Sequence, residues 1–483
     1  MTLELQHPQM VIGGETYAPD REHRIYTSPS TGQEVSDILL GSPEDVDRAV
    51  ASARAALPAL AALGLDGRAE LLRRTGDAIR AHADEFAALL ANEHGKTYYG
   101  DAPGEIGASA VAMADAGAQA RWMLEQHYPV STPGKRVMTV RRPRGVYGIL
   151  TPWNFPLGIA TQYYLGPGLA AGNSMVWIGA PSVNSTHALL AKIIAEIWPP
   201  GSVNFITGDG PVVGQALAGH PGVDAVGFTG STPVGNAVQI AAVGKPSFLE
   251  LGGNGPTVVF ADADIELAAA RIAGGSFANA GQICTASGRI LAHASVASQL
   301  ADAIAEQSKR FVLGNPFERE TTMGPVHRSE LAAAVLGQVE NAVAQGARLV
   351  TGGALLEGAP TSNYVLPTVV DNVPAGSDLH RMETFGPVAP VVHYETDDEL
   401  RELLNSSRFG LHGGVFTRDV ERGLAFGETL RVGHVNINDT SAYWEPSIPA
   451  GGAAGAASGI GRSGGPWSVL EMTEVQTFTL DLG

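Results

Sequence analysis

The chain has 483 residues, 44% of them hydrophobic, and its 31 basic and 49 acidic side chains give a net charge of −18. This length predicts two or three domains with sizeable cores, while the acidity argues against a nucleic-acid partner or binding to an anionic membrane. Because the chain has no apolar run of about 18 residues, no signal-peptide pattern in residues 1–20 and only one cysteine, we expect a soluble cytoplasmic protein without disulfides.

The first third of the chain shows helical periodicity. Ser42, Pro43 and the acids that follow them are typical of a helix start, with a capping serine and a proline at the first helical position. Apolar spacing predicts a second helix over residues 68–92, and an alanine-rich segment predicts a third over 104–126. We interpret the first two as scaffold and the third as one wall of a substrate passage or ordinary core.

From residue 145 onward, short apolar strands alternate with helices, which is typical of a parallel sheet with helical crossovers. The turn at residues 228–235 carries glycines at 230 and 235, which would let the backbone and a helix N-terminus approach a phosphate. A glycine pair alone is more often an ordinary turn. Strands are predicted at residues 145–150, 174–178, 203–206 and 225–228.

Residues 151–156, with the sequence Thr-Pro-Trp-Asn-Phe-Pro, form a rigid turn into a helix. The carboxamide of Asn154 can donate a hydrogen bond to an oxygen that becomes negative when a nucleophile attacks a carbonyl. Such a donor lowers the barrier by roughly 3 kcal/mol. Asparagine beside proline also serves simple turn chemistry, so the oxyanion role depends on finding a nucleophile elsewhere in the chain.

Glu250 ends an apolar strand and is followed by the glycine pair Gly252 and Gly253. A carboxylate that is partly desolvated in such a place has a raised pKa and can act as a general base. Considered alone, Glu250 would be interpreted as a surface glutamate at the end of a strand.

Cys284 is the only cysteine and lies among small residues between positions 278 and 288. Small neighbours would let a carbonyl group approach the sulfur, and a thiolate is the strongest nucleophile that a protein offers near neutral pH. The alternative is a buried cysteine that acts as a small hydrophobic residue.

The second half of the chain predicts helices over residues 295–312 and 329–345 and a strand over 364–370. His412 and His434 have no further ligand at metal-binding spacing, so we interpret them as solvated or structural and expect no metal site.

Four segments together resemble the aldehyde dehydrogenase superfamily, because they occur in that family's order and at its spacing. These are residues 151–156, 248–254, 277–287 and 383–387, and the similarity extends from residues 12–14 and 29–32 to 458–462. The resemblance implies an α/β fold with two lobes built on mostly parallel twisted sheets.

The implied domains are a Rossmann-like cofactor domain over residues 1–122 and 144–251 and a catalytic thiol domain over 252–465. An oligomerisation arm is implied over residues 123–143 and 466–483. In the resembled family the strands of this arm, here 137–143 and 475–482, would pair across subunits. A homodimer or homotetramer is therefore expected.

The resemblance also implies a reaction. Cys284 would add to an aldehyde, and Asn154 together with the Cys284 backbone N–H would stabilise the oxyanion. Hydride would pass to NAD or NADP, and Glu250 would activate the water that releases the carboxylic acid. Glu383 would hold the nicotinamide ribose hydroxyls and Phe385 would pack beside the nicotinamide ring. The implied cofactor-binding residues are Trp153, Ile178, Gly230, Ser231, Leu251, Glu383 and Phe385.

The sequence departs from the family pattern at two places. The lysine and acid that usually grip the adenosine ribose are replaced by Ile178 and Pro181, which leaves NAD or NADP open, with a lean toward NAD because the lysine is missing. Ala450 replaces a usual phenylalanine ahead of the small residues 455–457. This change could widen the pocket or only loosen a loop.

The aromatic residues of the loop 439–445 favour an apolar or aromatic aldehyde without identifying it. A cofactor-independent thiol esterase would use the same cysteine and oxyanion hole. A non-catalytic oligomeric protein on this fold is the third hypothesis, against which the presence of Cys284, Glu250 and Asn154 counts.

Overall fold

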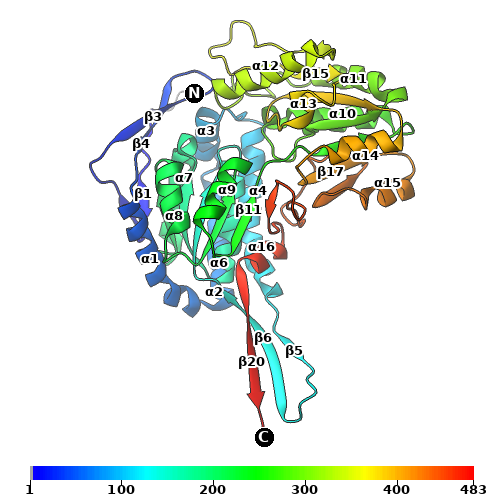
Figure 1. The fold of residues 1–483 in the computed structure, drawn as a ribbon. Helices are drawn as coiled ribbons and strands as arrows, with labels where there is room; N and C mark the ends of the chain where they lie inside the picture. The colour runs from blue at the N-terminus through cyan, green and yellow to red at the C-terminus, as the bar shows by residue number, and fades with distance from the viewer. Residues whose placement is uncertain (1–3) are drawn as a thin grey trace.

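The computed structural model describes residues 4–483, and these form two large sheets, one three-stranded sheet and one two-stranded sheet (Figure 1). Each large sheet is the centre of one lobe, which confirms the predicted α/β fold class. The predicted cofactor domain begins with residues 1–3, which lie outside the described residues.

The first sheet has the strand order β19-β11-β10-β7-β8-β9-β1-β2. Its five central strands are parallel, and β19, β1 and β2 are antiparallel additions at the two edges. The strands are β1 (Met10–Ile12), β2 (Glu15–Tyr17), β7 (Val146–Thr151), β8 (Ser174–Gly179), β9 (Val203–Ile206), β10 (Ala225–Thr229), β11 (Ser247–Glu250) and β19 (Gly459–Ile460).

Helices cover both faces of this sheet, which explains why its central strands are apolar along their whole length. α1, α8 and α9 contribute to one apolar cluster, and α2, α4, α6 and α7 contribute to the other. The helices of this lobe are α1 (Pro43–Ala62), α2 (Gly64–Ala81), α3 (Ala83–Glu93), α4 (Asp101–Gln119), α5 (Pro156–Ile159), α6 (Gly166–Ala171), α7 (Asn184–Ile197), α8 (Gln215–Gly219), α9 (Thr232–Ala241) and α16 (Pro466–Glu471).

The first predicted helix begins where expected, because Ser42 and Asp45 form a capping box ahead of α1. The single helix predicted over 68–92 is wrong: α2 and α3 are separate and meet at His82, whose φ of −100° and ψ of 21° leave helical geometry. Apolar side chains of both helices nevertheless enter the same core, so the apolar spacing alone did not reveal the break.

The helix predicted over 104–126 corresponds to α4, which ends at Gln119 and continues only as a short 3-10 turn.

The second sheet has the order β14-β15-β16-β13-β12-β17-β18. It packs in one apolar core with α10, α11 and α12. The strand predicted over 364–370 begins only at Thr368, because residues 364–367 leave the sheet and the Tyr364 hydroxyl donates to the Ser30 carbonyl instead. The strands are β12 (Pro256–Val259), β13 (Arg289–His293), β14 (Arg348–Thr351), β15 (Thr368–Asp371), β16 (Val388–Tyr394), β17 (His412–Phe416) and β18 (His434–Ile437), and the helices are α10 (Ile265–Phe277), α11 (Ala294–Ser308), α12 (Ser329–Ala344), α13 (Asp378–Arg381), α14 (Asp397–Asn405) and α15 (Val420–Gly427).

The arm projects below the first lobe and consists of β5 (Gln126–Tyr128), β6 (Lys135–Pro143) and β20 (Thr473–Asp481) (Figure 1). β6 and β20 pair antiparallel within one chain, from Thr473 opposite Pro143 to Asp481 opposite Lys135. The expectation that these two strands pair with each other across subunits is therefore wrong, because β6 and β20 pair within one chain. The small sheet of β3 (His23–Thr27) and β4 (Glu34–Leu39) lies near the N-terminus.

One predicted domain boundary also needs correction. The catalytic domain was expected to extend to residue 465, but β19 lies before that residue and pairs with β11 of the first sheet. The chain thus returns to the first lobe before it enters the arm. A short antiparallel edge strand of two residues carries too little pattern to be predicted from sequence.

Within residues 4–483 no single helix is long and apolar enough to span a membrane, and α1 and α2 meet that test only as a pair bent by 112°.

We expect Glu93→Ala to destabilise the first lobe. The buried Glu93 carboxylate accepts the backbone N–H groups of Ser185 (2.9 Å) and Thr186 (2.9 Å) and the Thr186 hydroxyl (2.7 Å) at the start of α7. Its removal leaves three buried donors without an acceptor, which costs about 2–4 kcal/mol. Urea unfolding measures the loss. The exposed Glu85→Ala is the control, and an unchanged midpoint for Glu93→Ala would contradict this role.

Candidate active site

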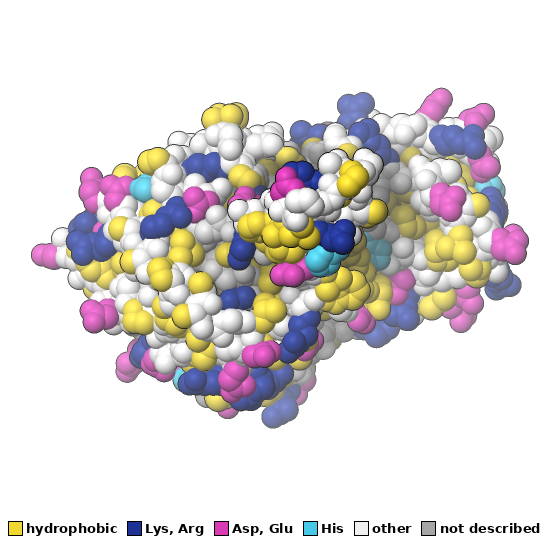
Figure 2. Space-filling view, turned by 90° about the horizontal axis from the view of Figure 1, so that it is seen from below, with side chains coloured by type: hydrophobic (Ala, Val, Ile, Leu, Met, Phe, Trp, Pro, Cys, Tyr) yellow, Lys and Arg dark blue, Asp and Glu magenta, His cyan; other side chains and the backbone are white. Residues whose placement is uncertain are grey.

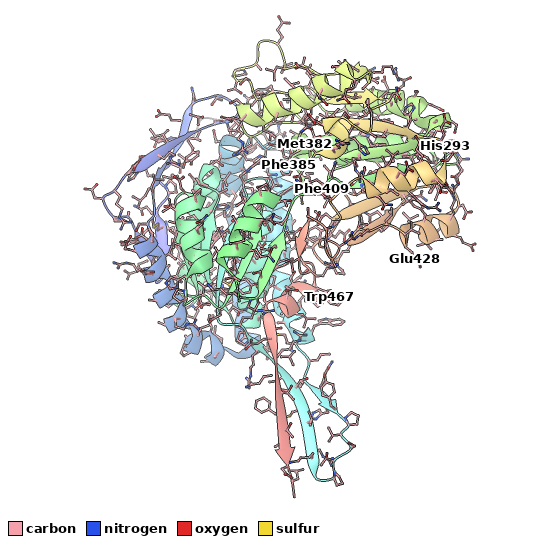
Figure 3. The ribbon with its side chains drawn as sticks, viewed as in Figure 1. His293, Met382, Phe385, Phe409, Glu428 and Trp467 are labelled. Atoms are coloured by element: carbon pink, nitrogen blue, oxygen red, sulfur yellow. The ribbon has the colours of Figure 1, made fainter. Side chains whose placement is uncertain are left out.

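The predicted site residues gather where the two lobes meet. Asn154 follows β7 and Glu250 ends β11, and these strands flank β10 in the same parallel orientation. Their carboxyl ends therefore lie at one edge of the first sheet, where ligands bind in open α/β sheets. Phe385 and Phe409, labelled in Figure 3, come to this junction from the second lobe.

A tight turn presents the cysteine loop. Asn279, Ala280 and Gly281 have φ values of 51°, 53° and 72°, so three successive residues are left-handed. A Cβ added to Gly281 would lie 2.0 Å from the Gly386 carbonyl oxygen. Only glycine therefore fits where this turn packs against the Glu-Thr-Phe-Gly-Pro segment.

Cys284 is half-buried and lines a cavity of about 270 Å³ between the lobes. Phe155, Tyr163 and Trp444 contribute aromatic side chains to the cavity wall. Tyr163 and Trp444 meet edge to face with ring centroids 5.5 Å apart, an arrangement that aromatic pairs favour. The thiol is thus on the wall of a small, largely apolar chamber.

The glycine pair after Glu250 brings the lobes into close contact. A Cβ on Gly253 would lie 2.1 Å from the Cys284 carbonyl oxygen, and one on Gly252 would lie 2.6 Å from a carboxylate oxygen of Glu383. The Gly253 backbone N–H donates to the other Glu383 oxygen at 2.9 Å. Because neither glycine carries a side chain, the segments that carry Glu250, Cys284 and Glu383 can lie in direct contact.

Glu250 is 5% exposed, and its Oε1 has no hydrogen-bond partner among the described residues. Burial raises its pKa well above the usual value, the charge of Glu471 raises it further, and Arg462 opposes both effects. A Cβ on Gly451 would lie 3.1 Å from this oxygen, so Gly451 leaves the space around it. The alternative of a surface glutamate does not describe this residue.

The thiol also has a raised pKa. Burial raises the pKa of Cys284 to about 12, the negative charges of Glu250 and Glu383 add to the effect, and hydrogen bonds from the backbone of Cys284 and Thr285 lower it. Cys284 consequently favours its uncharged thiol form near neutral pH, and burial shifts the pKa of Glu250 in the same upward direction. A charge formed at the sulfur needs a nearby donor or proton acceptor to stabilise it.

Asn154 is buried beside the cysteine loop, where its Nδ2 donates to the Gln282 carbonyl at 3.0 Å. A carboxamide has two N–H donors, so this contact fixes the amide and leaves a second donor. The contact brings the turn at 151–156 and the loop that carries Cys284 together.

The residues predicted to bind a cofactor fall into two groups. Trp153 and Phe385 meet edge to face with centroids 5.6 Å apart, and Trp153 also stacks on His327 at 4.3 Å. Ser231 is the N-cap residue of α9 and makes no capping bond with its side chain. Gly230 donates its N–H to the Glu250 carbonyl at 3.1 Å.

Two predicted cofactor residues are buried in the first lobe. Leu251 packs so closely on α9 that a Cβ on Gly235 would lie 2.3 Å from it. Ile178 is 3% exposed in the apolar cluster that also contains Leu217 of α8. The side chain that replaces the usual lysine therefore belongs to the apolar core of the first lobe.

Sequence reasoning assigned no site role to three residues around the thiol. His412 lines the cavity and is buried, so of its two predicted roles, solvated or structural, the structural one is confirmed. Its Nδ1 lies 3.1 Å from the Ser441 carbonyl, and burial lowers its pKa to about 3. Lys96 and Glu105 form a buried ion pair beside the site. The sequence signal that could have revealed this pair is Glu105, a glutamate on the apolar face of an alanine-rich helix.

No group of three or more metal-ligating side chains is arranged to hold an ion within residues 4–483. The described part of the chain instead offers a thiol, a buried carboxylic acid, a carboxamide and an apolar cavity.

The chain is similar to known proteins over nearly its whole length. The model of the aldehyde dehydrogenase family matches residues 17–478. The chain is 34% identical to a vanillin dehydrogenase of Pseudomonas fluorescens, with 98% of each chain covered.

Two solved structures share the fold. The structure of an NAD-dependent aldehyde dehydrogenase from Sinorhizobium meliloti has a TM-score of 0.94 and 33% identity, covering 99% of this chain and 95% of that one. The structure of an NADP-dependent enzyme from E. coli has a TM-score of 0.94 and 31% identity, covering 99% and 98%. The chain belongs to the aldehyde dehydrogenase family.

Proposed function

We propose that this protein oxidises an aldehyde to the carboxylic acid with NAD or NADP as the hydride acceptor, and that Cys284 is the nucleophile. The observation that carries the proposal is the position of the only thiol: it lines the cavity between the lobes, beside a buried carboxamide and a buried carboxylic acid. A buried cysteine with only a packing role would not need these polar neighbours.

Attack of the sulfur on the aldehyde carbon moves negative charge to the carbonyl oxygen. The free N–H of the Asn154 amide and the backbone N–H of Cys284 are the donors that stabilise this oxygen. The raised pKa of the thiol makes the thiolate a minor form but a reactive one. Enclosure of the reaction in an apolar cavity strengthens both hydrogen bonds.

Glu250 is the residue that removes the proton from water when the thioester is hydrolysed. Its raised pKa makes its carboxylate a stronger base than an exposed glutamate. The unpartnered Oε1 leaves a lone pair free for a water molecule. The carboxylic acid then leaves and the thiol is regenerated.

The residues present fit a nicotinamide dinucleotide. The first-turn N–H groups of α9 and the Ser231 hydroxyl suit a pyrophosphate, and the half-buried Glu383 carboxylate suits ribose hydroxyls. Trp153 and Phe385 supply apolar surface, and the bound nicotinamide would supply the hydride acceptor.

NAD is the favoured cofactor. Ile178 places hydrocarbon in the core at the position of the missing lysine, so β8 offers no cation there for a 2′-phosphate. Pro181 in turn supplies no carboxylate to repel that phosphate, so the preference is modest.

The favoured substrate is an apolar or aromatic aldehyde. Phe155, Tyr163 and Trp444 line the cavity beside the thiol, and a flat ring fits between aromatic walls. The vanillin dehydrogenase relative supports this substrate class.

Assembly into a homodimer or homotetramer is supported by the arm. Val475, Phe478 and Leu480 on β20 are exposed, and Figure 2, which views the molecule from the side of the arm, shows hydrophobic side chains gathered near the middle of that face. Exposed apolar side chains on a projecting sheet favour association.

The reaction is tested by following reduced-nicotinamide absorbance with NAD+ and NADP+ in parallel, against aliphatic, aromatic and acidic aldehydes. We expect turnover, highest with aromatic aldehydes and NAD+. Cys284→Ser should reduce the rate by on the order of 10³-fold or more, because a hydroxyl is a far weaker nucleophile, while cofactor binding persists. If no reduced-nicotinamide absorbance forms with either cofactor while the thiol still reacts with an electrophile, the thiol esterase would be favoured.

Glu250→Gln should separate the two halves of the reaction. We expect one burst of reduced cofactor per active site, followed by a steady rate that is lower by about 10²- to 10⁴-fold, because the thioester forms but water is not deprotonated. Rapid-mixing absorbance measures both phases. The exposed Glu266→Gln is the control. An unchanged steady rate in Glu250→Gln would place the base elsewhere.

Cofactor affinity should increase with pH around neutrality. Burial raises the pKa of Glu383 to about 7, against the opposing effects of the Gly253 N–H and Arg408. The carboxylate that accepts ribose hydroxyls exists above this pKa, so its fraction rises from about one tenth at pH 6 to about nine tenths at pH 8. We expect cofactor affinity to rise by up to about tenfold over this range.

Fluorescence titration of cofactor at pH 6, 7 and 8 measures the change. Glu383→Gln, which cannot ionise, should remove this pH dependence. The same slope in both proteins would show that another group is responsible.

A further inference from the structure

A buried ion pair lies beside the junction of Asn154 and the cysteine loop. The Lys96 Nζ and the Glu105 Oε2 are 3.3 Å apart, and each side chain is 1% exposed. Lys96 follows α3 and Glu105 lies in the first two turns of α4. The role proposed above for Cys284, Asn154 and Glu250 does not use either residue.

The glutamate holds the segment that carries Asn154. Its Oε1 accepts the backbone N–H groups of Leu157 at 2.8 Å and Gly158 at 2.9 Å, in the turn that follows Asn154. The Lys96 Nζ also lies 4.0 Å from the centroid of the Phe155 ring. Both members of the ion pair therefore contact the segment 154–158.

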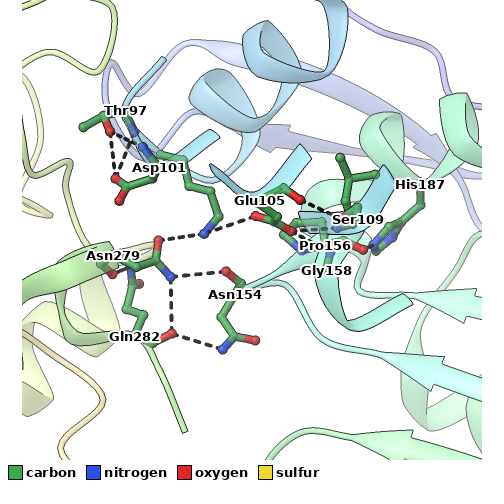
Figure 4. Close-up of polar contacts among 12 residues, drawn as sticks. Thr97, Asp101, Glu105, Ser109, Asn154, Pro156, Gly158, His187, Asn279 and Gln282 are labelled. Atoms are coloured by element: carbon green, nitrogen blue, oxygen red, sulfur yellow. Dashed lines mark hydrogen bonds and ion pairs between the residues drawn. The ribbon is translucent and has the colours of Figure 1, made fainter. Parts of the chain in front are cut away.

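The lysine also holds the loop that carries Cys284. Lys96 donates to the Asn279 Oδ1 at 2.9 Å, and the Asn279 Nδ2 donates to the backbone carbonyls of Asn154 at 3.2 Å and Gln282 at 3.3 Å. The Gln282 carbonyl is the group that accepts the Asn154 amide. Figure 4 shows these contacts as one connected network.

The contacts of this pair point to a role beyond stability. A buried ion pair adds little net stability compared with apolar side chains of the same volume, because both charges lose their hydration. Here every contact of Lys96 and Glu105 described above leads to the Asn154 segment or to the cysteine loop. These two segments must keep a fixed separation if the amide is to meet an oxygen bound at the sulfur.

We propose that Lys96 is a positioning residue that, through Glu105 and Asn279, fixes the Asn154 amide relative to the Cys284 loop. The inference rests on the proposed function, since Asn154 is taken as the oxyanion donor. A displacement of about 1 Å in such a site costs about 100-fold in rate. Loss of Lys96 should therefore slow the step in which the oxyanion forms and leave the sulfur itself reactive.

The first test is Lys96→Met, which keeps much of the side-chain volume and removes the charge. We expect the rate of the reduced-cofactor burst to fall by about 10- to 100-fold, with the KM for aldehyde changed less than about threefold. Alkylation by iodoacetamide reports on the thiol without an oxyanion, and Cys284 is the only cysteine. Its rate should stay within about twofold of the wild-type rate.

Lys245→Met is the matched control for removing a partly buried lysine. The Lys245 Nζ donates to the carbonyls of Ala218 at 2.8 Å and His220 at 2.7 Å, and neither belongs to the site. This variant should keep the wild-type burst rate.

A double variant distinguishes positioning from a general structural effect. If Lys96 acts through Asn154, adding Lys96→Met to Asn154→Ala should slow the burst by less than about threefold further, because the positioned donor is already gone. Independent effects that multiply would overturn the proposal. An equal fall in alkylation and burst rates would also overturn it.

Two further variants keep the test decisive if Lys96→Met does not fold. Lys96→Met with Glu105→Gln leaves no unpaired buried charge, and Asn279→Gly keeps the left-handed backbone while it removes the amide. Both should show the slow burst with a reactive thiol. A wild-type protein that oxidises no aldehyde would instead contradict the proposed function, so the two failures are distinguishable.

Discussion

The site depends on the absence of side chains at Gly252 and Gly253, which lets the two lobes come into contact. An added Cβ would come within 2.1 Å of the Cys284 carbonyl oxygen at one position and within 2.6 Å of the Glu383 carboxylate at the other. Larger residues would force the second lobe away from β11. Because Glu250 lies two residues before Gly252, the approach of the lobes also brings the carboxylic acid, the thiol and the cavity together.

The consequence of this close approach is a site that favours neutral groups. Burial raises the pKa of both Cys284 and Glu250, and each negative charge would disfavour the other. Burial and the charges of Glu250 and Glu383 thus hold the reactive thiol largely in its uncharged form. Charge develops there only where donors face it, which is the condition under which preorganised hydrogen bonds contribute most to catalysis.

The backbone around the thiol is held in an uncommon conformation by its surroundings. Non-glycine residues at positive φ, such as Asn279 and Phe385, each cost about 1–3 kcal/mol and persist only where neighbouring contacts require them. The side chain of Asn279 bonds to Lys96, and the ring of Phe385 packs on Trp153. Contacts with the first lobe therefore offset the cost of these backbone conformations in the second lobe.

The sequence by itself determined the local features of this protein. Ser42 and Pro43 defined a helix start, the apolar strands alternating with helices indicated a parallel sheet with helical crossovers, and the motifs around Asn154, Glu250 and Cys284 indicated the family. Each of these features depends on neighbours within a few residues, so it is readable from one segment. The break at His82 and the two-residue strand β19 were not readable, because packing against other segments decides them.

Only the tertiary structure decided which distant groups meet. Lys96 and Asn279 are 183 residues apart in the chain yet share a hydrogen bond, and the burial of Ile178 and His412 depends on elements far from both. Burial also decided the chemistry, because an isolated glutamate or cysteine in a sequence carries no record of its desolvation. Contacts between distant segments and the exclusion of solvent arise only in the folded chain. Both are needed to bring the recognised motifs together in one site.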